Sequence, residues 1–388
     1  MSSVGPGFEH LETNLLHAGR PEPPIEGAVV HPIFQSANYL MGDESSYGDV
    51  RYIRLNNTPN HRTLHQRLAC IENCEAALVT GSGMAAISST FLAFVRTGEH
   101  ILAHDALYGG THGFLQHDAP KLGISHTLLD CTRASGWEAA LRPETRMIYV
   151  EGITNPKMQV PDLEAVVAFA RAHKLVSVID NTIASPANFR PLDLGFDVVV
   201  HSATKYLNGH SDLVAGVVAG SRERVDAVKR VLDHMGGTLD PHACFLLERG
   251  LKTLALRVER QNASALRMAQ FLSQHAAVRH VNYPGLETHP EHARARKLFR
   301  GFGGMLSFYA RTDEVAARFL KRVKLPLHAA SLGGVESLVV RPSRSSHLGL
   351  KPEERARMGI TDDLVRVSVG IEAVDDLIAD FDQALAGA

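Results

Sequence analysis

Short apolar runs alternate with helix-spaced apolar positions through the middle of the chain, from about residue 61 to residue 241. The runs expected to be buried strands occupy residues 77–80, 100–104, 147–150, 175–179, 197–200 and 213–219. Between them, helical periodicity is clearest over residues 161–173, where Leu163, Val166, Val167 and Ala170 share one face. Buried strands separated by helices are typical of a mostly parallel sheet covered on both faces. The pattern therefore predicts an α/β large domain over residues 61–241.

The pattern changes on both sides of this region. Residues 242–388 begin with a long helical stretch at 245–275 and continue with strand-like runs at 278–282, 305–309 and 366–369 and helices near 314–323 and 374–385. This mixture predicts a smaller α+β C-terminal domain. Residues 1–60 lack a periodic pattern but carry spaced large side chains such as Phe34, Tyr39 and Tyr47. Since a free tail seldom does so, we expect an N-terminal arm that contacts a neighbouring subunit.

Composition narrows the classes of partner. A length of 388 residues exceeds what one hydrophobic core usually supports, and a net charge of −2 leaves no positive surplus for nucleic acid or an anionic membrane. The N-terminal residues do not resemble a secretory signal, and no apolar run approaches the ~20 residues that span a bilayer. Four scattered cysteines fit neither a disulfide framework nor a metal site. We expect a cytoplasmic protein that holds no metal.

Candidate chemistry lies just after two of the expected strands. Asp180 ends one of them, and Ser202, Thr204 and Lys205 follow a later one. Ligands of open α/β sheets bind outside the carboxyl ends of strands, so these residues are expected to meet in one crevice. Burying a lysine amine is costly unless it is paired or neutralised, and an imine with an aldehyde cofactor would remove the cost. An exposed lysine beside a helix cap is the structural alternative for this segment taken alone.

A glycine turn follows the strand expected at residues 77–80. The turn containing Gly83 and Met84 opens a helix, whose free N–H groups would bind a phosphate. Gly81, Gly83 and Ala86 also fit the dinucleotide spacing G-x-G-x-x-A, so an NAD-binding dehydrogenase is a rival interpretation. That interpretation leaves Asp180 and Lys205 without a role. Tyr108, in a Tyr-Gly-Gly turn after another strand, could stack on a flat cofactor, although such turns usually have no function.

Together these motifs resemble the Cys/Met-metabolism family of pyridoxal-phosphate (PLP) enzymes, the trans-sulfuration group. The resemblance runs from about residue 13 to residue 385, and its most specific part is the sequence SATKYLNGHSD at residues 202–212. Further matching segments lie at residues 82–86, 108–111, 180–182, 249–254, 331–338 and 366–372. The fold that this resemblance implies is the PLP-dependent transferase fold, type I. The implied assembly is a homotetramer formed from two dimers that share active sites.

The resemblance also implies a role for each site residue. Lys205 carries PLP as a Schiff base and, with Tyr108, is catalytic, while Asp180 pairs with the pyridine nitrogen and Tyr108 stacks on the ring. The phosphate is bound by Gly83, Met84, Ser202 and Thr204 and by Tyr52 and Arg54 of the neighbouring subunit. The substrate is bound by Arg366, which holds its carboxylate, and by Asn155, Ser331 and Glu336.

The activity implied is that of a carbon–sulfur lyase acting on a sulfur amino acid. By the same resemblance, Gly110 stands where methionine γ-lyases commonly carry cysteine, which argues against that activity. We expect a cystathionine γ-lyase, which catalyses α,γ-elimination. Cystathionine β-lyase, cystathionine γ-synthase and methionine γ-lyase remain alternatives, as does a PLP-binding protein without activity. The family's Glu-x-Pro-x-Asn-Pro is Glu-Gly-Ile-Thr-Asn-Pro at residues 151–156. The loop at residues 342–347 also departs from the family pattern, near the distal end of the substrate.

Overall fold

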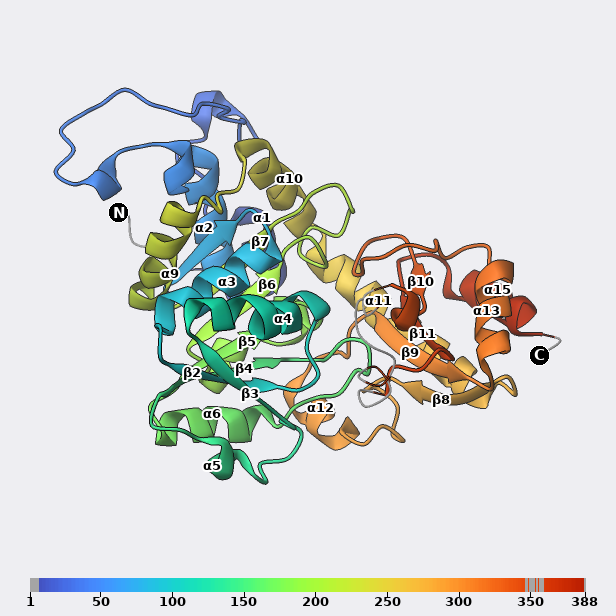
Figure 1. Cartoon of the computed structure of the whole chain (residues 1–388). Helices are drawn as coiled ribbons and strands as arrows, with labels where there is room; N and C mark the ends of the chain where they lie inside the picture. Colours follow the sequence, from blue (N-terminus) through green and yellow to red (C-terminus); the bar gives the residue numbers. More distant parts are fainter. Residues whose placement is uncertain (1–6, 346–347, 349–352, 354, 356–358, 387–388) are drawn as a thin grey trace.

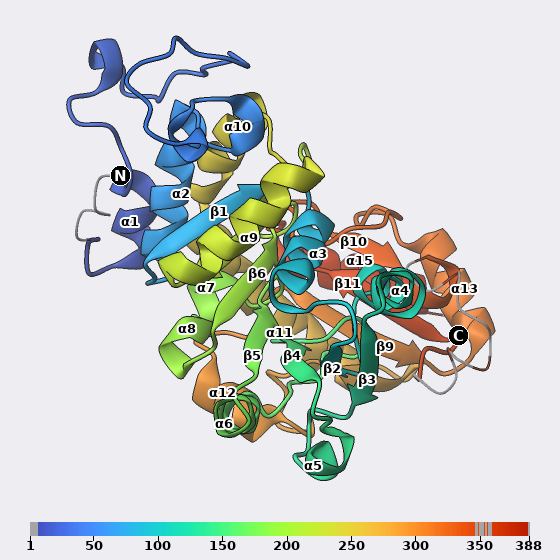
Figure 2. The same ribbon diagram turned by 60° about the vertical axis from the view of Figure 1, so that its left-hand side comes forward.

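A seven-stranded sheet forms the centre of the larger part of the molecule (Figure 1). The computed structural model describes residues 7–345, 348, 353, 355 and 359–386. The strand order is β1-β7-β6-β5-β4-β2-β3, which Figure 2 shows from β1 at the upper left to β3 at the lower right. The strands are β1 (Ala76–Thr80), β2 (His100–His104), β3 (Ser125–Leu129), β4 (Thr145–Glu151), β5 (Val176–Asp180), β6 (Val198–Ser202) and β7 (Gly216–Gly220).

The mostly parallel sheet expected from the sequence is confirmed. The pairs β3–β2, β2–β4, β4–β5 and β5–β6 are parallel, whereas β6–β7 and β7–β1 are antiparallel. The apolar runs did not indicate β3, because this edge strand is partly exposed along its whole length and carries His126 and Thr127. Its polar composition is what an edge strand requires.

Alternate residues of the central strands enter two different cores. Ile148 and Val150 of β4 point into one, whereas Met147 and Tyr149 point into the other. The core that contains Ile148 and Val150 lies between the sheet and helices α2 (Pro59–Ile71) and α6 (Leu163–Ala172). The core on the opposite face of the sheet is covered by α3 (Gly83–Phe94) and α9 (Arg222–Met235). Shorter helices complete the large part: α4 (Gly109–Gly113), α5 (Trp137–Ala140), α7 (Ser185–Asn188) and α8 (Pro191–Leu194).

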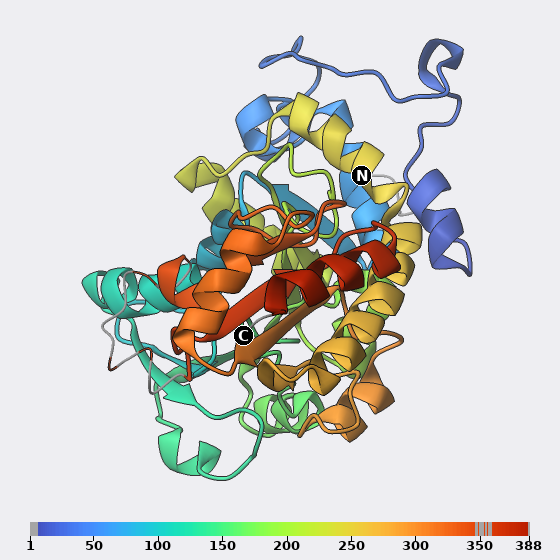
Figure 3. The ribbon, with the colours of Figure 1, turned by 90° about the vertical axis from the view of Figure 1, so that its right-hand side faces the viewer.

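A second, four-stranded antiparallel sheet lies in the C-terminal part, in the order β10-β11-β9-β8. Helices α13 (Asp313–Arg322) and α15 (Val374–Leu385) lie over it, as the orange and red helices of Figure 3 show. Phe308 of the sheet packs edge-on against Phe319, which in turn contacts Phe381. The strands are β8 (Val278–Asn282), β9 (Met305–Ala310), β10 (Leu338–Val340) and β11 (Leu364–Ser368). The three-residue β10 was too short to be recognised from its pattern.

The helical stretch expected at residues 245–275 is two helices, α10 (Pro241–Leu251) and α11 (Leu254–Gln274). Where they separate, the Gly250 carbonyl accepts hydrogen bonds from the Thr253 N–H at 3.3 Å and from the Arg257 side chain at 2.9 Å. Helix α10 packs on α2, and Cys244 and Leu247 belong to the large core. Since side chains on both sides of position 241 share that core, the domain limits at 60 and 241 stay predictions.

Among its described residues, 7–60, the N-terminal arm forms no hydrophobic core cluster of its own. Its helix α1 (Leu11–His17) packs on α2 through the buried Leu15, and much of the rest runs along the surface. Val29 is 80% exposed and Leu40 is 99% exposed. Contact of this arm with a neighbouring subunit stays a prediction. In the described part of the chain no helix is long and apolar enough to cross a membrane.

The loop that follows Lys205 is folded over a buried arginine. The Arg257 guanidinium donates to the Tyr206 carbonyl at 2.8 Å and to the Gly250 carbonyl at 2.9 Å. Burial lowers the pKa of Arg257 to about 10, so it remains charged at neutral pH. Gly209 has a φ of +76°, and a Cβ there would lie 2.0 Å from the Arg257 guanidinium. The backbone carbonyls therefore solvate the charge and fix the loop.

We expect Arg257→Met to lower the free energy of unfolding by about 2–4 kcal/mol, because the Tyr206 and Leu207 carbonyls would each lose the Arg257 donor, at about 1–3 kcal/mol each. Methionine keeps the apolar stem of the side chain. The matched control is Arg260→Met on the same helix, whose guanidinium donates to the Glu372 carbonyl at the surface. Urea unfolding of both variants tests this, and equal midpoints would contradict the role of Arg257.

Candidate functional site

A cavity of about 580 Å³ opens at the carboxyl ends of β4, β5 and β6, between the N-terminus of α3 and the small domain. Ten of the thirteen sequence-predicted site residues line it. Those are Gly83, Met84, Tyr108, Asn155, Asp180, Ser202, Thr204, Lys205, Ser331 and Arg366. The remaining lining residues are Ser82, Ile87, Gly110, Glu151, Ile153, Thr182, Ile183, Val214, Ala330, Leu332 and Ser345.

Lys205 projects into this cavity from the turn after β6. Its Nζ donates a hydrogen bond to the Ser331 hydroxyl at 2.9 Å, which joins the large domain to the small one. Burial lowers the pKa of the Lys205 amine to about 8, and the positive charge of Arg366 adds to this effect. A substantial fraction of the amine is therefore neutral near physiological pH, as a nucleophile or general base requires.

Asp180 ends β5 and is almost fully buried. One carboxylate oxygen accepts from the Thr182 backbone N–H at 2.9 Å and from its hydroxyl at 2.5 Å. The other accepts from the Tyr149 hydroxyl at 3.4 Å. Burial raises the pKa of Asp180, and the two Thr182 hydrogen bonds oppose this. The carboxylate is thus held in one orientation at the cavity wall.

The N-terminus of α3 approaches β6 closely at Gly83. A Cβ on Gly83 would lie 2.8 Å from the Ser202 Cβ, so a larger residue would not fit. The Ser82 side chain caps the helix by accepting from the Ala85 N–H at 3.0 Å. The preceding strand β1 is an antiparallel strand at the sheet edge, unlike the parallel βαβ unit that binds dinucleotides. This topology removes the basis for the dehydrogenase interpretation.

Tyr108 lies at the start of α4, with its side chain at the cavity. Its backbone N–H donates to a carboxylate oxygen of Glu151 at 2.5 Å. Burial, and then the neighbouring Asp180, raises the pKa of Glu151 well above its usual value. A Cβ on Gly110 would lie 2.5 Å from the Tyr108 ring and 2.9 Å from the Met84 sulfur. Glycine at position 110 therefore lets the ring lie close over the turn.

Arg366 lies on β11 and reaches the cavity from the small domain. Its guanidinium donates to the Asn155 side-chain oxygen at 3.3 Å and to the Ser331 carbonyl at 2.7 Å. Its Nε is buried without a hydrogen-bond partner in the structure. Burial lowers the pKa of Arg366 to about 10, so the group is still a cation at neutral pH. This fork suits a carboxylate.

Three predicted site residues do not line the cavity of their own chain. The Arg54 guanidinium donates to the Asp233 carbonyl and to the Tyr47 hydroxyl, each at 2.7 Å, and lies 5.7 Å from the centre of the Tyr52 ring. Glu336 is exposed on the small domain. The roles given to Tyr52, Arg54 and Glu336 stay predictions. Residues 346 and 347 of the loop at 342–347 lie outside the described residues.

The Thr204 hydroxyl lines the cavity but already bonds to the backbone. It donates to the Ala215 carbonyl at 3.2 Å and accepts from the Ala215 N–H at 3.1 Å. The Ser202 N–H donates to the Thr182 hydroxyl at 2.8 Å. A phosphate contact by the hydroxyl of either residue stays a prediction.

Sequence reasoning missed three polar groups of the site: Tyr149, Glu151 and Thr182. Tyr149 and Glu151 lie at the end of β4, beside the strand that Asp180 ends. Their position at the end of a buried strand, the feature that identified Asp180 in the sequence, could have identified them as well. Among the residues that the structure describes, no group of three or more His, Cys, Asp or Glu could hold a metal ion.

Comparisons with known proteins give one family. The family model described as Cys/Met metabolism PLP-dependent enzyme matches residues 12–386. The chain is 38% identical to cystathionine beta-lyase of Coxiella burnetii, over 97% of this chain and 98% of the relative. It is 40% identical to L-methionine gamma-lyase of Pseudomonas putida, over 98% and 97%. It is 40% identical to cystathionine gamma-lyase of Bacillus subtilis, over 96% and 98%.

The lowered pKa of Lys205 has a consequence for stability in the protein prepared without cofactor. Between pH 8 and 10.5 the unfolded chain binds more protons at this residue than the folded one, so folding gains stability as pH rises. Relative to Lys205→Met, the wild type should therefore gain about 1–3 kcal/mol across that window, a range reduced for solvent screening of a half-buried amine. Urea unfolding at several pH values measures this, and a difference that is constant with pH would contradict it.

Proposed function

The chain belongs to the Cys/Met metabolism family of PLP-dependent enzymes, and on that premise we propose that it is a cystathionine γ-lyase-like enzyme. PLP dependence and carbon–sulfur lyase chemistry on sulfur amino acids come with the family. The choice of cystathionine and of α,γ-elimination is the proposal. The chain is about equally identical to a cystathionine β-lyase, a methionine γ-lyase and a cystathionine γ-lyase, so sequence identity does not select the substrate or the reaction. The proposal is therefore argued from the residues of the site.

The residues present fit PLP. Lys205 offers an amine of lowered pKa, Asp180 a buried carboxylate, and the α3 N-terminus a set of backbone N–H groups for a phosphate. When bound, PLP supplies an aldehyde that joins to an amine and a protonated ring that takes up the electron pair released at Cα. We assign the ring nitrogen to Asp180, the aldehyde to Lys205 and one face of the ring to Tyr108.

The protein groups then divide the remaining work. Arg366 has five N–H donors, of which two hold Asn155 and Ser331, so the buried Nε–H and two terminal N–H groups are left, and two of these three can bind the substrate carboxylate. Lys205, partly neutral near pH 8, takes the proton from Cα. Asp180 keeps the ring nitrogen protonated. The Ser331 hydroxyl, 2.9 Å from the Lys205 Nζ, keeps that amine beside the carboxylate site.

The close approach at Gly110 supports cystathionine over methionine as the substrate, and α,γ-elimination is our proposal for its cleavage. A side chain at position 110 would displace the Tyr108 ring, and methionine γ-lyases commonly have cysteine there, which speaks against that activity. γ-Elimination must also move a Cβ proton, whereas β-elimination needs only the Cα proton to be removed. Tyr108 and Lys205 both line the cavity and could share these two transfers. β-Lyase and γ-synthase activities are the alternatives.

A homotetramer with shared active sites is part of the proposal. The cations among the described cavity-lining residues are Lys205 and Arg366, and both are assigned to other groups. A phosphate dianion would then need a cation from elsewhere, and Arg54 of a neighbouring subunit is our candidate. Exposed apolar residues of the arm, Leu40 and Met41 among them, support burial of this arm in an assembly.

We expect purified enzyme to convert cystathionine to cysteine, 2-oxobutyrate and ammonia. Separating 2-oxobutyrate from pyruvate by chromatography decides the position of cleavage. Homocysteine with pyruvate would replace the γ-lyase proposal by a β-lyase, and cofactor absorbance without any product would indicate a silent PLP protein. Lys205→Ala should form neither oxo acid, which shows that the products come from this site.

Asp180→Asn should lower kcat by about 100-fold or more while the cofactor stays bound, because an amide cannot hold the ring nitrogen protonated. The matched control is Asp193→Asn, a carboxylate at the surface that accepts a hydrogen bond from Asn73. Steady-state rates and cofactor absorbance measure both effects. A kcat near the wild-type value would remove Asp180 from the mechanism.

A further inference from the structure

The loop between β4 and α6, residues 152–160, carries Asn155 and is buried along most of its length. Asn155 belongs to this loop of the large domain, yet its side-chain oxygen accepts from Arg366 of the small domain at 3.3 Å. Gly152, at the start of the loop, is tied to the large sheet through the Asp180 carbonyl at 2.9 Å. Glu151 of β4 also accepts a hydrogen bond from the Asn155 backbone, and contacts from the small domain hold the loop on its other side.

Ser307 holds the loop next to Asn155. This fully buried residue of β9 donates from its hydroxyl to the Pro156 carbonyl at 2.7 Å and accepts from the Asn282 side chain at 2.9 Å. In the small sheet, Ser307 pairs directly with Arg366 of β11. The paired residues Arg366 and Ser307 of the small sheet thus contact the consecutive loop residues Asn155 and Pro156, respectively.

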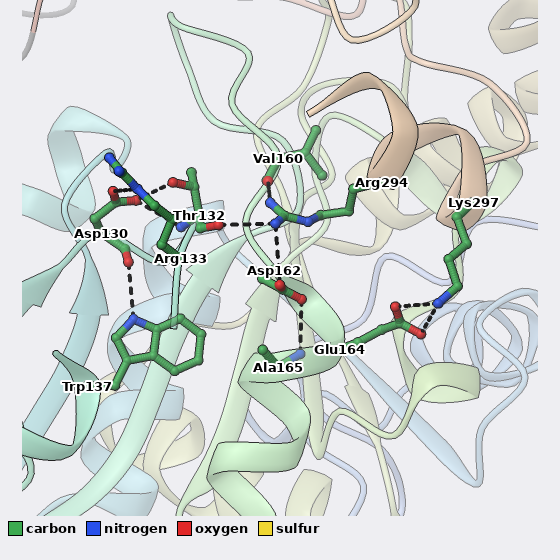
Figure 4. A network of polar contacts seen from close by, with 10 residues as sticks. All are labelled: Asp130, Thr132, Arg133, Trp137, Val160, Asp162, Glu164, Ala165, Arg294 and Lys297. Atoms are coloured by element: carbon green, nitrogen blue, oxygen red, sulfur yellow. Dashed lines mark hydrogen bonds and ion pairs between the residues drawn. The ribbon is translucent and has the colours of Figure 1, made fainter. Parts of the chain in front are cut away.

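A second anchor comes from the segment that joins β8 to β9. Helix α12 (His292–Leu298) of this segment packs on the large core, and its Arg294 donates to the Val160 carbonyl at 2.7 Å. The same guanidinium donates to the Thr132 carbonyl at 3.1 Å and to Asp162 at 3.3 Å, as Figure 4 shows. Two nearby residues also contact the loop backbone: His289 at Met158 and Glu291 at Val160.

We propose that Ser307 and Arg294 are positioning residues that fix the loop of residues 152–160, so that Asn155 keeps Arg366 oriented for the substrate carboxylate. The inference rests on the proposed role of Arg366. Neither residue touches the cavity, since Ser307 acts through the Pro156 carbonyl and Arg294 through the Val160 carbonyl. If the loop moves away, the hydrogen bond between the Asn155 oxygen and a terminal N–H of Arg366 breaks. The guanidinium then loses a contact that fixes its orientation, and its Nε–H no longer points consistently at the substrate carboxylate.

The same interface offers a matched control. Lys297, one turn after Arg294 on α12, forms an ion pair with Glu164 of α6 at 2.6 Å (Figure 4). It also joins the segment to the large domain, but its side chain is 65% exposed and it does not contact the loop. Lys297→Met therefore removes a cation and a contact from the same helix while leaving the anchors of Asn155 intact.

The experiment compares holoenzymes carrying Ser307→Ala, Ser307→Thr, Arg294→Met and Lys297→Met. Glycine, which offers an amine and a carboxylate but no leaving group, is titrated while the cofactor absorbance is followed, and KM and kcat are measured with cystathionine. We expect Ser307→Ala and Arg294→Met to raise the Kd of glycine and the KM about three- to tenfold, because each variant loses one hydrogen bond to the loop backbone. The kcat and the cofactor spectrum should stay near wild type, because Lys205 and Asp180 keep their partners.

Lys297→Met should match the wild type, and Ser307→Thr, which keeps the hydroxyl, should restore tight glycine binding. The inference is overturned if Arg294→Met binds glycine as the wild type does, or if Lys297→Met weakens binding as much as Arg294→Met. Should Ser307→Ala fail to fold, Arg294→Met, which changes a half-buried side chain, decides alone. A wild type that binds glycine but cleaves no thioether amino acid would refute the proposed function and leave the anchors testable through glycine.

Discussion

Among the described residues, neither of the two cations that line the cavity, Lys205 and Arg366, has a carboxylate partner, and the rest of the site is organised around this constraint. Lys205 bonds to the Ser331 hydroxyl, and Arg366 bonds to the Asn155 oxygen and the Ser331 carbonyl. Neutral acceptors satisfy the N–H groups but do not neutralise the charges, and such burial is costly. A ligand that brings an aldehyde to Lys205 and a carboxylate to Arg366 would relieve both costs together, so these two residues favour a ligand with both groups.

The topology of the large sheet makes this arrangement possible. Parallel strands β4, β5 and β6 end at the same edge, which places Glu151, Asp180 and Ser202 side by side. Strand β7 runs antiparallel to β6, and the turn between them, which contains Lys205, is held by a hydrogen bond from Arg257 to the Tyr206 carbonyl. The small sheet closes the cavity from the opposite side with Arg366. The acid and the carboxylate receptor are therefore carried by different sheets, and their separation depends on how the two sheets are joined.

Much of this site could be predicted from the sequence, because strand-end positions are local features. Asp180 and Lys205 follow recognisable buried strands, and the glycine turn at Gly83 precedes a recognisable helix. The anchors of Asn155 could not be found in this way. Ser307 is a single serine in an apolar strand, and its importance arises from pairing with Arg366 across strands about sixty residues apart in sequence. The edge strand β3 escaped for a related reason, since its partial exposure removes the apolar signal.

The same physics explains why the cofactor is easier to infer than the bond that is cleaved. The groups that bind PLP must satisfy buried charge and hydrogen bonds, so few residue types fit at Asp180 and Lys205. In the proposed mechanism, regiochemistry depends instead on where the Tyr108 ring lies relative to Lys205. A Cβ at position 110 would clash with this ring, so the residue there constrains where the ring can lie. On this proposal, relatives can share the charged framework and still differ in reaction, because packing around one aromatic ring selects the reaction.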